Sequence, residues 1–115
     1  MIYRRCAIDP KLLIRLLRNL QAFRSLFLTE GVSALTGPDG TVYDLFDIVF
    51  LYESRDRFLT PQRSKAVELV FYRDMTERDA ALAMGLSPGA PVSSYANQGA
   101  KALAAAWDGS VLVAG

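Results

Sequence analysis

Apolar side chains recur every three or four positions through most of this chain, which is the spacing of one face of an α-helix. Three such segments open with a capping oxygen followed by a proline, whose missing N–H costs nothing at the first helical position. These pairs are Asp9-Pro10, Thr60-Pro61 and Ser87-Pro88. The first segment predicts a helix over about 10–29, with the apolar face Leu13, Leu16, Leu17, Leu20, Phe23 and Phe27.

Two further helix starts come from a threonine placed three residues before an aspartate, the spacing of a capping box. Thr41 with Asp44 predicts a helix over about 42–57, and Thr76 with Asp79 predicts one that begins at Glu77. The apolar run at 48–52 could also pass for a buried strand, but its length and the capping box favour helix. The sequence therefore predicts an all-α domain of about five helices.

Residues 32–43 are the exception to this helical pattern. A Gly-Pro-Asp-Gly turn at 37–40 separates two short runs, 32–35 and 41–43, which could pair as a small β-hairpin. Thr41 would then belong to a strand and not to a helix cap. Both interpretations remain open from sequence alone.

Composition and charge limit the class of protein. A chain of 115 residues with 51% hydrophobic content is long enough for one modest globular domain. The net charge of +1 does not by itself indicate a nucleic-acid partner, but its distribution is uneven. Residues 1–24 are basic, residues 25–58 are acidic and the remainder is balanced. The contrast fits either contacts within the chain or a nucleic-acid contact by the first segment.

Several kinds of chemistry are made unfavourable by the residues that the chain lacks. It has no histidine, and its single cysteine, Cys6, cannot form an internal disulfide and suits a reducing cytoplasm. The acidic residues of 44–56 would more simply cap and solvate a helix than hold a metal.

The apolar run from 12 to 28 is interrupted by Arg15, Arg18 and Arg24, so we do not expect it to span a membrane. We expect a cytoplasmic protein that is not an enzyme and has no cofactor.

The most informative stretch is 76–87, which has the form of a helix, a glycine turn and the start of a second helix. Thr76 would cap the first helix, Gly85 would take the left-handed conformation that ends it, and Ser87 would cap the next. This is the sequence form of a helix-turn-helix, which presents its second helix to a groove of DNA.

The surrounding residues carry a family resemblance. The pattern covers 59–103 and comprises Leu59-Thr60-Pro61, Ala66-Val67-Glu68-Leu69, Met75-Thr76, Asp79-Ala80-Ala81, Met84-Gly85-Leu86-Ser87, Val92 and Leu103. It resembles the fourth region of bacterial sigma factors and the related LuxR-type output domains. Through Pro91-Val92, Tyr95-Ala96 and Gly99 it is also similar to small helix-turn-helix proteins encoded by actinobacteriophages. We expect three regions within a single compact unit: a helical core or partner surface at 1–58, a helix-turn-helix at 59–107 and a tail at 108–115.

The resemblance implies a transcription regulator that binds double-stranded DNA through its second helix. Base contacts would come from Ser93, Ser94, Asn97 and Gln98, and phosphate contacts from Arg63, Lys65, Arg78 and Lys101. Each of these side chains could instead be ordinary solvated surface.

Two departures from the sigma pattern leave room for another function. Val92 lies five residues after Ser87, where the pattern has four, so the second helix could begin near Pro91 with 88–90 as loop. The outward face of that helix also carries only one cation, Lys101. The alternative is a module that binds RNA polymerase or another host protein without touching DNA. A third possibility is a subunit of a phage assembly complex.

Overall fold

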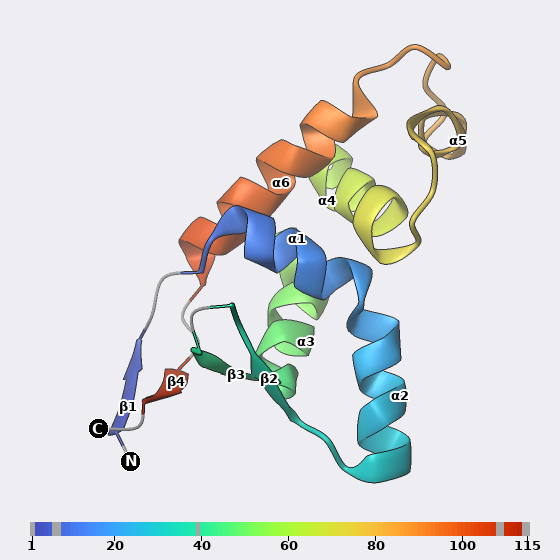
Figure 1. Cartoon of the computed structure of the whole chain (residues 1–115). Helices are drawn as coiled ribbons and strands as arrows, with labels where there is room; N and C mark the ends of the chain where they lie inside the picture. The colour runs from blue at the N-terminus through green and yellow to red at the C-terminus, as the bar shows by residue number, and fades with distance from the viewer. Residues whose placement is uncertain (1, 6–7, 39, 108–109, 114–115) are drawn as a thin grey trace.

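The computed structural model describes residues 2–5, 8–38, 40–107 and 110–113, with backbone only for the first and last of these ranges. Cys6 and Asp39, both invoked above, lie outside the described residues. The fold is mostly helical and includes a small antiparallel sheet (Figure 1). The α-helices are α1 (Pro10–Arg18), α2 (Leu20–Glu30), α3 (Leu45–Glu53), α4 (Pro61–Val67), α5 (Glu77–Ala83) and α6 (Val92–Ala106). A 3₁₀ turn, η1 (Arg55–Arg57), follows α3, and a π-helical segment, η2 (Glu68–Tyr72), continues α4.

Three of the predicted helix caps are confirmed. Asp9 accepts a hydrogen bond from the Lys11 N–H at 2.8 Å, with Pro10 at the first helical position of α1. Thr60 caps α4 in the same way, and Thr76 caps α5 by accepting from the Asp79 N–H at 3.1 Å. Each side chain satisfies a donor that the helix itself leaves unpaired.

The expectation of one helix over 10–29 is wrong, because the chain bends at Asn19. The side-chain amide of Asn19 donates to the Arg15 carbonyl at 2.8 Å, and its backbone leaves helical geometry at φ −105° and ψ 7°. An asparagine side chain that bonds to a nearby carbonyl in this way competes with the regular helix. The described residues therefore contain six α-helices and not about five, and α2 runs sharply away from α1 (Figure 1).

The expected helix over 42–57 is also corrected. Residues Val42–Asp44 form a strand, and α3 begins only at Leu45, where Asp44 caps it by accepting from the Phe46 N–H at 2.8 Å. Asp44 is thus the cap itself, and Thr41 belongs to the turn before the strand. The β-hairpin expected near 32–43 is confirmed, with Leu35 opposite Tyr43.

The sheet contains two strands that the sequence pattern did not predict. Its order is β1 (Ile2–Arg5), β4 (Ser110–Val113), β3 (Val42–Asp44) and β2 (Ala34–Thr36). All its pairs are antiparallel, and Leu112 of β4 lies opposite both Tyr3 of β1 and Val42 of β3. Part of the expected tail at 108–115 is therefore a sheet strand between the first strand and the hairpin.

Helix α6 runs along the upper half of the molecule in Figure 1, where it packs against α4 and α1. The hairpin, α2 and α3 form the other half. One buried apolar cluster runs through both, and its fully enclosed side chains include Leu13, Leu17, Leu20, Leu45, Ile48, Val67, Val92 and Leu103.

Within the ranges described, none of the helices has the length and apolar character needed to cross a bilayer.

Candidate nucleic-acid interface on the α6 helix

The end of α5 is built as its sequence predicts. Gly85 takes a left-handed conformation with φ +73°, which residues with a Cβ rarely adopt. The next amide, that of Leu86, donates to the Ala81 carbonyl at 2.8 Å and so satisfies one of the last helical acceptors. The turn therefore ends α5 sharply and sends the chain toward α6.

The start of α6 differs from the simplest prediction. Ser87 does not cap it, because residues 86–91 form a loop and the helix begins at Val92, just after Pro91. This confirms the alternative in which the helix begins near Pro91. Pro91 offers no side-chain hydrogen bond to the helix, so the first amides of α6 need a partner from elsewhere.

Glu77 of α5 supplies that partner. Its carboxylate oxygen Oε2 accepts from the Ser93 N–H at 2.8 Å. Hydrogen bonds from the side chain and backbone of Ser93 favour the charged carboxylate and hold the pKa of Glu77 below its ordinary value. The carboxylate also sits at the positive end of the α6 dipole. An acidic side chain of α5 thus fixes where α6 begins.

The inner face of α6 is the stripe that its sequence predicts. Val92, Ala96, Gly99 and Leu103 are all buried, together with Ala100. A Cβ built on Gly99 would lie 2.6 Å from Cγ2 of Val67 on α4 and 3.3 Å from the Arg63 carbonyl oxygen. The absence of a side chain at Gly99 therefore lets α4 and α6 approach closely.

The outer face of α6 carries most of the predicted base-contacting residues. Ser94, Asn97, Gln98 and Lys101 are all exposed, and their spacing of three, one and three places them on one stripe. Ser93 is different, because it is half-buried and is hydrogen-bonded to Glu77. Ser93 is therefore part of the α5–α6 junction.

The predicted phosphate-contacting cations are spread over three helices. Arg78 is exposed on α5, and Lys101 is exposed on α6. Arg63 on α4 is half-buried and runs close to α6, since its Cβ would lie 3.6 Å from a Cβ on Gly99. Lys65, also on α4, forms an ion pair with Glu68 at 3.3 Å. The structure thus places Arg63 against α6, the helix that carries Lys101. Lys65 is instead paired with Glu68.

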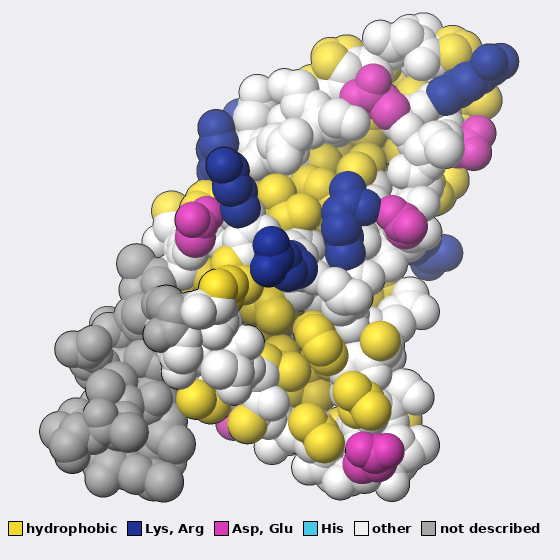
Figure 2. All heavy atoms as spheres, viewed as in Figure 1, with side chains coloured by type: hydrophobic (Ala, Val, Ile, Leu, Met, Phe, Trp, Pro, Cys, Tyr) yellow, Lys and Arg dark blue, Asp and Glu magenta, His cyan; other side chains and the backbone are white. Residues whose placement is uncertain are grey.

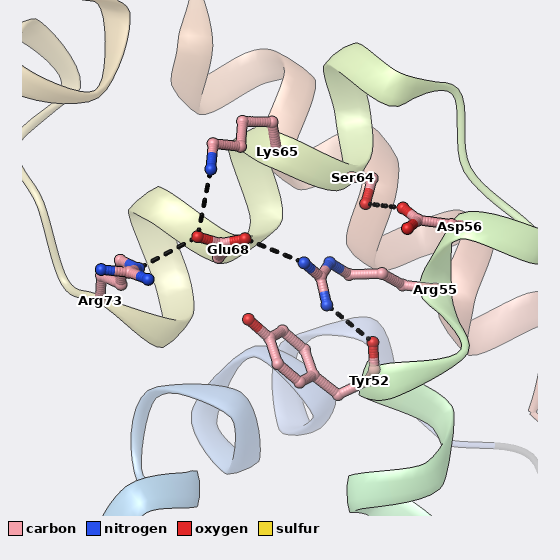
Figure 3. Close-up of polar contacts among 7 residues, drawn as sticks. All are labelled: Tyr52, Arg55, Asp56, Ser64, Lys65, Glu68 and Arg73. Atoms are coloured by element: carbon pink, nitrogen blue, oxygen red, sulfur yellow. Dashed lines mark hydrogen bonds and ion pairs between the residues drawn. The ribbon is translucent and has the colours of Figure 1, made fainter. Parts of the chain in front are cut away.

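A separate charged cluster, which sequence reasoning missed, surrounds Glu68 (Figure 3). Its carboxylate meets Nη2 of Arg55 at 2.9 Å, Nε of Arg73 at 3.0 Å and Nζ of Lys65 at 3.3 Å. Only 16% of the Arg55 side chain and 15% of the Glu68 side chain are exposed. The signal in the sequence was a lone acidic residue within the apolar run 66–72.

Tyr52 closes this cluster on the side of α3. The Arg55 guanidinium lies 4.4 Å from the centre of the Tyr52 ring and donates to the Tyr52 carbonyl at 3.2 Å. Burial raises the pKa of the Tyr52 hydroxyl to about 12, against the opposing effect of the nearby Arg55 charge. Three cations thus share the one carboxylate of Glu68, and the cluster joins η1, α4 and η2.

The acidic residues considered for a metal are used in other ways. Asp44 caps α3, Glu53 pairs with Arg24 at 2.6 Å, and Asp56 accepts a hydrogen bond from Ser64. Burial, and then the charge of Asp44, raise the pKa of Asp47 above its ordinary value. Among the described residues, no group of three or more Cys, Asp or Glu side chains is arranged to hold a metal ion.

Comparisons with known proteins add no relative to this description: no protein-family model, no curated protein and no solved structure matches the chain.

Proposed function

We propose that this protein is a transcription regulator that binds double-stranded DNA by placing α6 in the major groove. The observation that carries the proposal is the division of α6 into two faces. Its inner stripe is buried against α4 and α1, and its outer stripe of Ser94, Asn97, Gln98 and Lys101 is exposed. The left-handed turn at Gly85 and the resemblance of 59–103 to the fourth region of sigma factors support the same function.

The exposed groups fit the chemistry of a base edge and its flanking phosphates. Asn97 and Gln98 each carry an amide that can make paired hydrogen bonds to adenine. Lys101, Arg78 and Arg63 would contact phosphates. Ser94 would contact a base or a phosphate, whereas Ser93 is hydrogen-bonded to Glu77 and Lys65 is paired with Glu68. In this function the protein would act in the cytoplasm.

Binding to DNA of random sequence tests the proposal most directly. A fluorescently labelled random 20-base-pair duplex is titrated with the full-length protein at several salt concentrations. We expect measurable binding at low salt and a fall in affinity as salt rises, with a logarithmic slope of about −0.9 for each phosphate contacted. Absence of binding at 20 mM salt, with the protein folded, would contradict the proposal.

One observation favours a second function, a module that binds RNA polymerase or another host protein without contacting DNA. The Glu77 carboxylate stands at the N-terminal end of α6, the end that recognition helices direct at base edges, where it would repel phosphates. Leu82 on the adjoining α5 is 51% exposed, which suits a protein contact. Retention of purified host RNA polymerase by the immobilised protein, combined with no DNA binding at low salt, would support this function.

A further inference from the structure

An apolar hollow lies away from the exposed face of α6, in the other half of the molecule. It encloses about 620 Å³ between α1, α2 and β2. Figure 2 shows it as a band of hydrophobic side chains between the hairpin and α2, with basic side chains above it. Its walls are mostly apolar, with Leu12, Leu16, Phe23, Leu26, Val32 and Leu35 among them. The volume is within the range of about 300–1,000 Å³ that is usual for binding pockets.

One wall of this groove is the open edge of the sheet. Strand β2 is the last strand in the order and pairs with β3 along one edge (Figure 1). Its three residues line the groove. Hydrogen bonds from Leu45 N–H to the Ser33 carbonyl and from Gly37 N–H to the Thr41 carbonyl, both at 2.7 Å, fix the alternation of the ladder. In an antiparallel ladder the residues between bonded pairs direct their amides and carbonyls outward. Ala34 and Thr36 are those residues.

Among the described residues that line the groove, the one charged side chain is basic. Arg15 lines it from α1, whose cations are Lys11, Arg15 and Arg18 and which has no acidic residue. Arg18 is paired with Asp74 at 2.7 Å, whereas Arg15 is exposed at the groove. An occupant with an acidic group would therefore be complementary to Arg15.

From these three features we propose that the groove binds an extended segment of a partner protein, which adds to β2 as a further strand. Backbone groups of Ala34 and Thr36 hydrogen-bond the segment. One apolar side chain enters the groove, and an acidic side chain meets Arg15. This is recognition by strand addition, in which backbone bonds give affinity and pockets for alternate side chains give specificity. The proposal does not depend on DNA binding.

The experiment is selection from a random octapeptide library displayed on phage, using the full-length protein. We expect enriched peptides with alternating apolar residues and at least one Asp or Glu. Selection on the Arg15→Glu variant should exchange the acidic residue for Lys or Arg. The proposal is overturned by a library that yields no enrichment, or by the same acidic peptides on both baits.

The mode of binding is tested with the selected peptide. Thr36→Pro removes an outward N–H and leaves the bonds to β3 in place, so the affinity should fall at least tenfold; Thr36→Val, the matched control, should bind as the parent does. Single N-methylation along the peptide tests the same point without changing the protein. We expect loss of binding at alternate positions only. Equal tolerance at every position would show a helical or irregular ligand and would overturn strand addition.

Discussion

Glu77 of α5 accepts a hydrogen bond from the backbone N–H of Ser93, sixteen residues further along the chain, at the first turn of α6. The contact takes the place of a local cap, since Pro91 provides none. The two helices are joined by the loop at 86–91, and this bond connects a side chain of α5 directly to the start of α6. The junction between α5 and α6 therefore includes a side chain that titrates.

Substitution Glu77→Gln should make the protein less stable at neutral pH but not in acid. The hydrogen bonds from Ser93 lower the pKa of Glu77, so its contribution is present above the ordinary glutamate pKa, about 4.3, and is lost as pH falls through the lowered value. Urea midpoints of parent and variant at pH 7 and pH 3 measure this. Arg78→Gln, on the same helix, is the control: its midpoint difference from the parent should be the same at pH 7 and pH 3. If the midpoint difference between Glu77→Gln and the parent is equal at both pH values, the stabilising role of the Glu77 carboxylate is contradicted.

Substitution Gly99→Ala should cost about 1–3 kcal/mol of unfolding free energy, because the new methyl would lie 2.6 Å from Val67 Cγ2. Gly89→Ala is the matched control, since nothing lies within 4 Å of a Cβ there. Chemical denaturation measures both. The double change Gly99→Ala with Val67→Ala should cost less than the two single changes together. If the two costs simply add, the close approach of α4 and α6 is not the cause of the stability lost in Gly99→Ala.

Substitution Glu68→Gln should destabilise by about 3 kcal/mol, because it leaves the mostly buried Arg55 charge without its partner. Arg73→Ala removes an exposed cation from the same carboxylate and should cost no more than about 1 kcal/mol. The ratio of the two losses, measured by urea unfolding at pH 7, tests the role of burial. Equal losses would show that Arg55 is not the critical partner.

Lys101→Ala should reduce the magnitude of the salt slope of DNA binding by about 1, as expected for one lost phosphate contact. Arg24→Gln on α2, which Figure 1 places on the far side of the molecule from α6, is the control and should leave the slope unchanged. Asn97→Ala should instead alter which sequences are preferred in a selection from random duplexes. If Lys101→Ala and Arg24→Gln change the salt slope equally, the DNA does not bind at α6.

Raising the pH should weaken the fold between about 10 and 12 through Tyr52. Burial raises its pKa to about 12 in the folded protein, so its contribution is complete below the unfolded value of about 10 and is lost as pH approaches the folded one. The tyrosinate absorbance near 295 nm follows the ionisation. In Tyr52→Phe this part of the alkaline loss of stability should be absent.

Local chemistry accounts for what the sequence predicted well. Asp9, Thr60 and Thr76 cap helices because each needs only its near neighbours, and the buried stripe of α6 follows from a single period. The break at Asn19 was missed because leucines at helical spacing continue across it, and only the side-chain bond to the Arg15 carbonyl reveals it. Strand β4 was missed because its partners are about 70 and 108 residues away in the chain.

Within the candidate site, the exposure of Asn97, Gln98 and Lys101 followed from their helical spacing. The engagement of Ser93 by Glu77 did not, because it depends on the path of the loop at 86–91. The Glu68 cluster likewise joins residues of three segments, and helical periodicity, which relates residues three or four apart, cannot detect it.

The position of β4 in the sheet has a consequence for how the protein is made. Among the described strands, β4 lies between β1 and the hairpin, so β1 lacks its partner, and β3 has only β2, until residue 113 has been synthesised. The contacts of α4 with α6 need the chain only as far as residue 106 and can form before the sheet is complete. Nascent chains should therefore resist proteases over α4 and α6 while β1 is still cleaved, and β1 should become protected only once β4 has emerged.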